Sequence, residues 1–468
     1  MALLLLLLPM TASAQAPVRA VRAGDFEALT LSLPGFLVKS AGVNGPGGAP
    51  GVALLLASQK NLKGPKSLLF FDPEKRSLQT LASGLHEEVN TVLGFDLAGD
   101  GALAPVAGMP GVLFAPAGGG GARKVLDLPA ADLRSVSGLG GPVRPWIPVA
   151  HTGVLELLGG GPGGLVRRAS FPLPVRAEKQ RWGLRLVSPP VTLLPGDPAL
   201  FAVGPEASGR RRLQTVLVPA DGSPAIESWS LLPGEERLSM DRRYLRLDGR
   251  PVLAAVTVEK IGLLAKKRVR VFNLELDRSR KGTGPAFAVE TDCPLWWPLD
   301  SAALDADGDG RQDLVLSHPG GLRGREMLVT AYRGLGGGRF EREPRRWKLN
   351  DEPTDWLYGP DLTGDGVPDL LVYVGDRLLL YPGDAKGSRP LAGRPLWSFA
   401  VSGAPKKEQR KDDDEDQGPS GDETLNPERD RAVESLELPG GGRITYARGA
   451  QADGRTVLTL VRRPAPGA

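Results

Sequence analysis

Cysteine and histidine are almost absent from this chain of 468 residues. The single cysteine, Cys293, excludes an intramolecular disulfide and any metal cluster that several cysteines hold. Of the three histidines, His86 lacks the second histidine of a zinc-protease helix, and we expect His318 to be a surface residue after a strand. The chain also lacks the Gly-x-Ser-x-Gly elbow of serine hydrolases. Carboxylates are plentiful, so residue types alone leave a glycosidase or a polysaccharide lyase open.

Long hydrophobic runs are missing as well. The apolar run Leu3–Leu8 is far too short to span a bilayer, and no later run is long enough, so we expect no membrane span. Small residues at Ala12, Ala14 and Ala16 fit the small-x-small pattern of a signal-peptidase site. We therefore predict a signal peptide at residues 1–16 and a secreted, periplasmic or cell-surface protein. The basic start of such a leader is absent, which indicates a natural start codon upstream of Met1.

Neither sign of charge dominates the chain. Lys and Arg number 58 against 54 Asp and Glu, and the formal net charge is +4. Short basic clusters such as Arg210–Arg212 and Lys266–Arg268 are typical of solvated turns and edge strands, so we expect no nucleic-acid partner. Residues 404–434 differ from the rest: a basic block, then an acidic block at 412–416, with almost no apolar residues. We predict a disordered charged insertion there.

Glycine and proline, in contrast, are abundant. The 62 glycines and 43 prolines make up more than a fifth of the chain, which excludes helical bundles and coiled coils. Between these breakers lie short runs of strand-forming residues, such as Val52–Leu56 and Leu370–Val374. Many short strands separated by turns are typical of a sandwich, a barrel or a propeller. The composition therefore predicts an all-β fold.

An internal repeat distinguishes these three architectures. The segments Asp305–Leu314 and Asp361–Leu370 share one Asp/Gly pattern, start 56 residues apart and each lead directly into an apolar strand. A weaker copy begins at Asp96. A period of about 50 to 60 residues with several strands per unit suits propeller blades. We therefore predict one β-propeller over residues 17–468, with seven or eight four-stranded blades.

The two clear repeats carry oxygen ligands at alternate positions. Glycines such as Gly308 and Gly310 allow the backbone to curl so that the odd-numbered side chains converge. All-oxygen nests of this kind suit calcium, which accepts irregular coordination. The predicted ligands are Asp305, Asp307, Asp309, Asp313 and the carbonyl of Arg311 in the first loop, and Asp361, Thr363, Asp365, Asp369 and the carbonyl of Val367 in the second. We expect the second loop to bind more weakly because it has one carboxylate fewer.

The two clear loops must be distinguished from an EF-hand and from a simple turn. An EF-hand needs a glutamate at position 12, where this chain has Leu316 and Val372, so that motif is excluded. The weaker copy at Asp96 has Ala98 and Ala104 at positions 3 and 9, so we expect a turn without metal there. An Asp/Gly turn without metal is also the simpler alternative for the two clear loops.

The pattern Asp-x-Asp/Asn/Thr-x-Asp-Gly-x-x-Asp-Leu entering a strand resembles the FG-GAP/VCBS repeats of integrin-α-like β-propellers. The resemblance is specific over about residues 290–385 and rests on the units at 305–314 and 361–370. It implies one calcium loop within a blade and an extracellular adhesion or interaction module. The partner it implies is a protein or glycan ligand at the cell surface or in the periplasm.

Aromatic residues recur just before each of the two loops. Trp296 and Trp297 precede Asp305, and Trp356 and Tyr358 precede Asp361. We expect them to pack between neighbouring blades, and exposed platforms for a sugar or peptide are the alternative. The sequence favours a non-catalytic, calcium-stabilised binding or adhesion scaffold. A propeller enzyme, a lyase or glycosidase acting on extracellular polysaccharide, is the alternative function, and a periplasmic assembly factor is a third.

Overall fold

The computed structural model describes most of the chain between residues 19 and 464. The residues left out of this range are 61, 63, 110–111, 128–134, 137–145, 152–153, 162–163, 173–184, 188–197, 206–210, 218–224, 231–253, 262–265, 274–286, 295–298, 322–323, 337–338, 404–431, 452 and 454. The predicted signal peptide, Trp296, Trp297 and most of the predicted charged insertion therefore lie outside the described residues. Within them, the secondary structure is almost entirely strand, with one 3-10 turn at Pro46–Gly48. The all-β prediction is confirmed.

The strands form a series of antiparallel sheets in chain order. The first four sheets each contain four strands: β3 (Phe36–Asn44), β4 (Pro50–Ala57), β5 (Lys66–Asp72) and β6 (Ser77–Leu85); β7 (Thr91–Phe95), β8 (Ala104–Met109), β9 (Val112–Pro116) and β10 (Ala122–Asp127); β11 (Ser135–Val136), β12 (Trp146–His151), β13 (Val154–Gly161) and β14 (Gly164–Pro172); and β15 (Arg185–Val187), β16 (Pro198–Pro205), β17 (Arg211–Leu217) and β18 (Ala225–Ser230).

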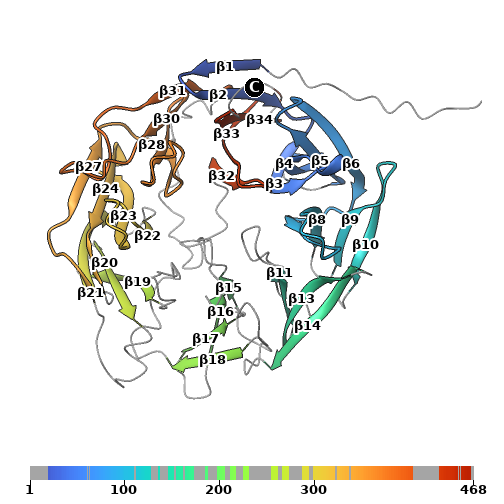
Figure 1. Cartoon of the computed structure of the whole chain (residues 1–468), viewed down its shortest axis with the longest axis horizontal. Helices are drawn as coiled ribbons and strands as arrows, with labels where there is room; N and C mark the ends of the chain where they lie inside the picture. The colour runs from blue at the N-terminus through green and yellow to red at the C-terminus, as the bar shows by residue number, and fades with distance from the viewer. Residues whose placement is uncertain are drawn as a thin grey trace, which may run out of the picture.

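The second half of the chain continues this pattern. The sheets are β19 (Ala254–Ile261), β20 (Lys266–Asn273) and β21 (Phe287–Pro294); β22 (Asp300–Leu304), β23 (Asp313–Gly320), β24 (Glu326–Tyr332) and β27 (Arg345–Leu349), with the hairpin β25 (Gly334–Gly336) and β26 (Arg339–Phe340) between the last two; and β28 (Pro353–Tyr358), β29 (Leu370–Val374), β30 (Arg377–Tyr381) and β31 (Trp397–Ala400). In Figure 1 the sheets are arranged around a ring, with β3, β22 and β28 towards its centre and β6, β27 and β31 towards its outside.

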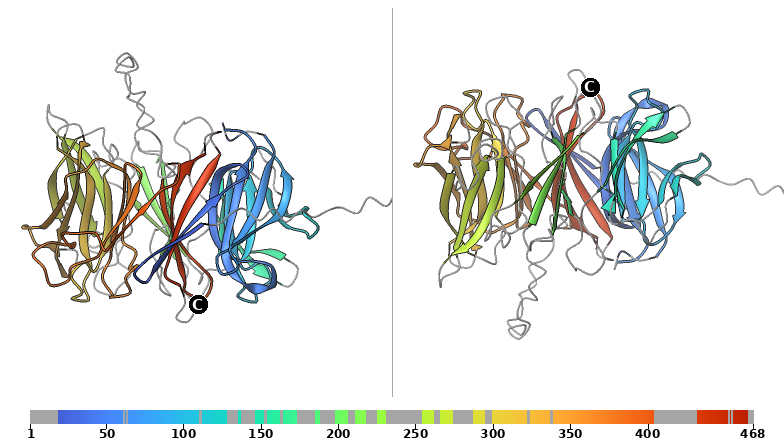
Figure 2. Two further views of the ribbon diagram at one scale, coloured as in Figure 1. Left: turned by 90° about the horizontal axis from the view of Figure 1, so that it is seen from above. Right: turned by 90° about the horizontal axis from the view of Figure 1, so that it is seen from below.

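The last sheet combines the two ends of the described chain. Its order is β32 (Val433–Glu437), β33 (Arg443–Ala450), β34 (Thr456–Arg462), β2 (Phe26–Ser32) and β1 (Arg19–Ala23). Strand β2 pairs with β34 over six residues, from Glu27 opposite Arg462 to Ser32 opposite Val457. Figure 2 shows this sheet between the blue N-terminal sheets and the orange and yellow sheets of the later chain.

The hydrophobic core lies between neighbouring sheets. Trp356 of β28 is buried in a cluster with Val315 and Val329 of the preceding sheet, and its indole Nε1 donates to Ser317 Oγ at 2.9 Å. For Trp356 this confirms the predicted packing between sheets. Burial of large apolar side chains on both faces of such sheets supplies the main stabilisation of a fold with so few helical contacts.

Two sequence predictions need correction. His318 does not lie on the surface: β23 continues beyond its apolar start as far as Gly320, and His318 is buried within it. The predicted insertion at 404–434 also extends too far, because Val433 and Glu434 belong to β32, where Val433 is fully buried. In both cases strand pairing with a neighbour, β24 or β33, continues past the residues whose polarity indicated a loop. In the described part of the chain, no helix has the length and hydrophobicity needed to cross a membrane.

Candidate metal centre in the aspartate loops

The two predicted loops occupy the same place in consecutive sheets. Residues 305–312 connect β22 to β23, and residues 359–369 connect β28 to β29, so each joins the first strand of a sheet to the second. The weaker copy, 96–103, makes the same connection between β7 and β8. The segments that repeat in the sequence therefore occupy equivalent positions in their sheets.

All three loops have the same curled backbone. Gly308 and Gly310 have φ angles of 72° and 81°, in the left-handed region that residues with a Cβ rarely adopt. The corresponding glycines of the other loops have similar angles: Gly364 75°, Gly366 86°, Gly99 78° and Gly101 85°. The prediction that glycines curl these loops is confirmed, and it holds for the degenerate copy as well.

The first aspartate of each loop holds this curl by accepting backbone hydrogen bonds. Asp305 accepts from the amide of Asp309 at 3.0 Å and from that of Gly310 at 2.8 Å. Asp361 accepts from Gly364 and Gly366, and Asp96 from Gly99, Asp100 and Gly101. Asp96 makes these hydrogen bonds in a loop that lacks two of the predicted ligands, so the first aspartate holds the curl in all three loops.

The aspartate at position 9 of each clear loop is buried and anchors the loop. Asp313 is fully buried and accepts from the amides of Ala306, at 3.2 Å, and Gly334, at 2.8 Å. Asp369 is equally buried and accepts from Leu362, Thr363 and Gly383 at 2.7 to 2.9 Å. Burial raises the pKa of Asp313 to about 6, and burial also raises the pKa of Asp369. These two carboxylates tie the loop to the glycine that follows the third strand of its sheet.

Three carboxylates of the first loop converge. Ligand oxygens of Asp305, Asp307 and Asp309 all lie within 4.8 Å of one another. Three hard oxygen donors at this spacing fit the donor chemistry of calcium. Burial and the neighbouring charge of Asp309 raise the pKa of Asp307. For Asp309, burial is outweighed by hydrogen bonds from the Arg311 amide and from Arg333, which lower its pKa.

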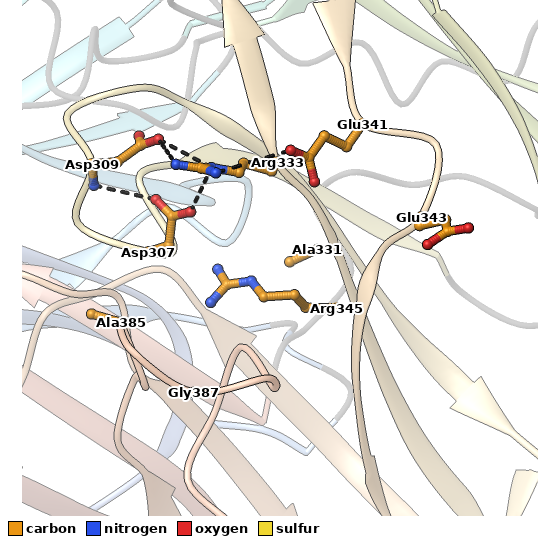
Figure 3. Close-up of a pocket in the computed structure, with 9 residues that line it drawn as sticks. All are labelled: Asp307, Asp309, Ala331, Arg333, Glu341, Glu343, Arg345, Ala385 and Gly387. Carbon is orange, nitrogen blue, oxygen red and sulfur yellow. Dashed lines mark hydrogen bonds and ion pairs between the residues drawn. The ribbon is translucent and has the colours of Figure 1, made fainter.

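A cationic side chain already lies on this cluster. Arg333, directly after β24, places Nε 3.1 Å from Asp307 Oδ2 and Nη2 2.9 Å from Asp309 Oδ2 (Figure 3). The guanidinium takes the place of a metal ion, since it contacts carboxylate oxygens that a metal ion would use. Its presence there supports the view that these carboxylates are arranged to hold positive charge.

The cluster opens into a cavity of about 370 Å³. Asp307 and Asp309 lie at one side of it, Glu341 and Glu343 at another, and Arg345 between them (Figure 3). The cavity is completed by Ala331, Arg333, and Ala385 and Gly387 from the connection after β30. Its lining is therefore strongly charged, with carboxylates in excess of guanidinium groups.

The structure thus groups only part of the predicted ligand set. Asp305, Asp307 and Asp309 form the one cluster of three acidic side chains found among the described residues, and Asp313 lies outside it. In the second loop Thr363 Oγ1 donates to Asp361 at 3.4 Å, and Asp365 accepts from the amide of Val367, as Asp309 does from that of Arg311. The carbonyls of Arg311 and Val367 stay predicted ligands.

Sequence reasoning missed Arg333, Gly334 and Gly383. A signal for them exists: Tyr332-Arg333-Gly334 and Tyr381-Pro382-Gly383 both begin with the last residue of the third strand of a sheet that carries an aspartate loop. In each case the tyrosine is buried, and the glycine amide donates a hydrogen bond to the aspartate at position 9 of the loop.

One known protein family matches the region of the two aspartate loops. The family described as FG-GAP-like repeat matches residues 296–372, which contain the whole first loop and its successor. Phosphatidylinositol-glycan-specific phospholipase D of Mus musculus is 35% identical over 114 residues, which are 23% of this chain and 11% of that protein. The chain thus spans about a tenth of the length of this curated relative. A solved structure described as the Dos1 propeller aligns with 92% of this chain and 93% of its own, at 9% identity and a TM-score of 0.46. The resemblance to the FG-GAP repeat β-propellers is confirmed, and the matched repeat at 296–372 carries it.

Proposed function

We propose that this chain is a calcium-stabilised β-propeller that acts as a non-catalytic binding scaffold outside the cytoplasm. The observation that carries the proposal is the convergence of Asp305, Asp307 and Asp309 in the FG-GAP-like repeat. Bound calcium would neutralise these neighbouring carboxylates and cross-link a loop that connects the inner strands of its sheet. The second loop, with Asp361, Thr363 and Asp365, would take a further ion.

The proposed propeller has eight blades. Eight of the described sheets contain three to five strands, and each of the first seven follows the previous one in chain order. The pairing of β2 with β34 would close the ring by completing the last blade with the N-terminal strands. A ring closed in this way leaves no long unpaired edge between its first and last blade.

The proposed role is binding of a protein or glycan partner. The sequence has no recognised catalytic motif, and the carboxylates of both loops are engaged by backbone amides. The signal-like segment at 1–16 and the FG-GAP-like repeat support a secreted, periplasmic or cell-surface location. An enzyme acting on extracellular polysaccharide is the alternative, and the partial likeness to a phospholipase D adds lipid hydrolysis to the activities worth assaying.

The metal is tested on the intact protein. We expect calcium to copurify and to be measurable by elemental analysis, and EDTA to lower the melting temperature until calcium is added back. A protein that contains no calcium after purification in calcium-containing buffer, and melts identically with and without EDTA, would rule out the proposed stabilisation. Assays with labelled polysaccharides and phospholipids test the alternative. Turnover of either substrate would show that the protein is an enzyme and would contradict the proposed non-catalytic role.

A further inference from the structure

Arg333 has no counterpart in the second aspartate loop. Gly334 and Gly383 occupy equivalent positions after the third strand of their sheets, because each donates to the aspartate at position 9 of its loop. The residue before each glycine is Arg333 in one case and Pro382 in the other. Proline carries no charge, so only the first loop has a cation in this position.

A cation that contacts the second loop, Arg463, does so in a different way. Arg463 donates from Nη1 to the carbonyl oxygen of Thr363 at 2.8 Å and pairs with Asp25 at 3.1 Å. It therefore contacts the loop backbone, whereas Arg333 contacts Asp307 and Asp309 through their carboxylate oxygens. The loop with the additional carboxylate is the one with the additional guanidinium.

Arg333 also has a third acidic neighbour, outside the aspartate loop. Glu341 lies at 4.0 Å from Arg333 Nη1, on the side of the cavity away from the aspartate cluster (Figure 3). The Arg333 side chain is about half exposed, at 48%, so a change of rotamer towards Glu341 requires no rearrangement of the core.

We propose that Arg333 is a built-in counter-ion that competes with calcium for Asp307 and Asp309 and thereby sets the affinity of the first loop. This inference rests on the proposed calcium site. Without metal, the guanidinium screens the repulsion between the carboxylates. With metal, the ion takes the same oxygens and Arg333 moves to Glu341. The extra carboxylate of the first loop then does not give it the tighter binding that its charge alone predicts.

The test is calcium titration by calorimetry on the full chain in an Asp365→Asn background. Asp365 is exposed and its carboxylate accepts one amide, which the Asn oxygen also accepts, so the substitution weakens the second loop alone. Adding Arg333→Gln removes the competing charge, and we expect Kd for calcium to fall about tenfold. Arg339→Gln is the matched control, because Arg339 is exposed on β26, carries the same charge and should leave Kd unchanged.

Melting supplies a second measurement that separates the outcomes. Without calcium, Arg333→Gln should melt below the parent protein, since its carboxylates lose their counter-ion. In saturating calcium the two should melt together. Calcium binding with equal or weaker affinity in Arg333→Gln would refute the role of Arg333 while leaving the calcium site intact. Absence of calcium binding in all the proteins would overturn the calcium site and this inference with it.

Discussion

Glu27 of β2 and Arg462 of β34 stand opposite each other in the sheet that joins the two ends of the chain, and their side chains form a buried ion pair. Arg462 Nη2 lies 3.2 Å from Glu27 Oε2, with Glu27 only 1% and Arg462 only 9% exposed. Arg76 and Glu74, from the turn between β5 and β6, extend the pair into a four-residue network. The network thus connects the first sheet to the last.

Removing one partner of this pair should destabilise the fold strongly. Glu27→Gln removes the buried counter-charge of Arg462 and leaves it only the half-exposed Glu74. Loss of one partner of a buried ion pair costs about 3 to 5 kcal/mol of unfolding free energy. The measurement is chemical denaturation. Asp25→Asn is the matched control: Asp25, in the turn before β2, pairs with Arg463, directly after β34, and both are exposed, so a change below about 1 kcal/mol is expected. Equal effects of the two substitutions would contradict the claim that burial makes the Glu27 pair important.

The aspartate at position 5 should contribute to calcium binding in the first loop and not in the degenerate loop at Asp96. Asp309 and Asp100 both accept the amide two residues later, and their loops share the same glycine conformation. Asp309→Asn should therefore reduce the rise in melting temperature that calcium produces, because it removes a converging carboxylate. Asp100→Asn should leave that rise unchanged. Thermal melts with and without calcium decide the matter, and a loss of the calcium effect in Asp100→Asn would show that the third loop binds metal too.

Gly334 should not tolerate a side chain. A Cβ at this position would lie 2.2 Å from the backbone oxygen of Gln312, which is next to Asp313. Gly334→Ala must therefore displace the amide that Asp313 accepts, and we expect a loss of about 2 to 3 kcal/mol in unfolding free energy. At Gly442 a Cβ would meet only ordinary contacts with Leu438 at 3.8 Å, so Gly442→Ala is the control. If Gly334→Ala unfolds at the same denaturant concentration as the control, the Asp313 anchor is unimportant.

Asp313 should give the calcium-free protein a characteristic pH dependence. Its pKa in the folded state, about 6, lies above the ordinary value of 3.8. Between these two values the folded state binds more protons than the unfolded state, so the free energy of unfolding falls as pH rises through this window, by roughly 3 kcal/mol at most. Denaturation in EDTA at pH 4 to 7 measures the slope. Asp313→Asn cannot titrate and should lack this part of the decline; parallel slopes for both proteins would disprove the assignment.

The sequence predicted the parts of the site that are close together along the chain. The aspartate spacing and the glycines between them define the loop, because side chains within nine residues converge through backbone conformation alone. Asp313 was predicted as a ligand from its place in the motif. Its role as a buried anchor depends on Gly334, whose amide becomes available only where β24 ends.

Contacts between distant segments could not be predicted in the same way. Arg333 reaches Asp309 across 24 residues, and Arg462 reaches Glu27 across 435. The residues that flank Arg333 and Arg462 in the sequence do not identify the carboxylates that these arginines contact. Their partners are fixed by strand pairing and by the position of the last sheet, which periodicity does not specify. The alternation of short strands and turns, in contrast, is local, and it was sufficient to predict the all-β fold.

The pairing of β2 with β34 has a consequence for synthesis. Strand β2 carries Leu29 and Leu31, which are fully buried in the finished protein, yet its partner β34 is translated much later, with Arg462 following Glu27 by 435 residues. Until then β2 has an unpaired edge of apolar sequence, which is prone to associate with other chains. Completion of the fold must therefore wait until β34 has been translated, and a product truncated before Thr456 would keep this edge permanently open.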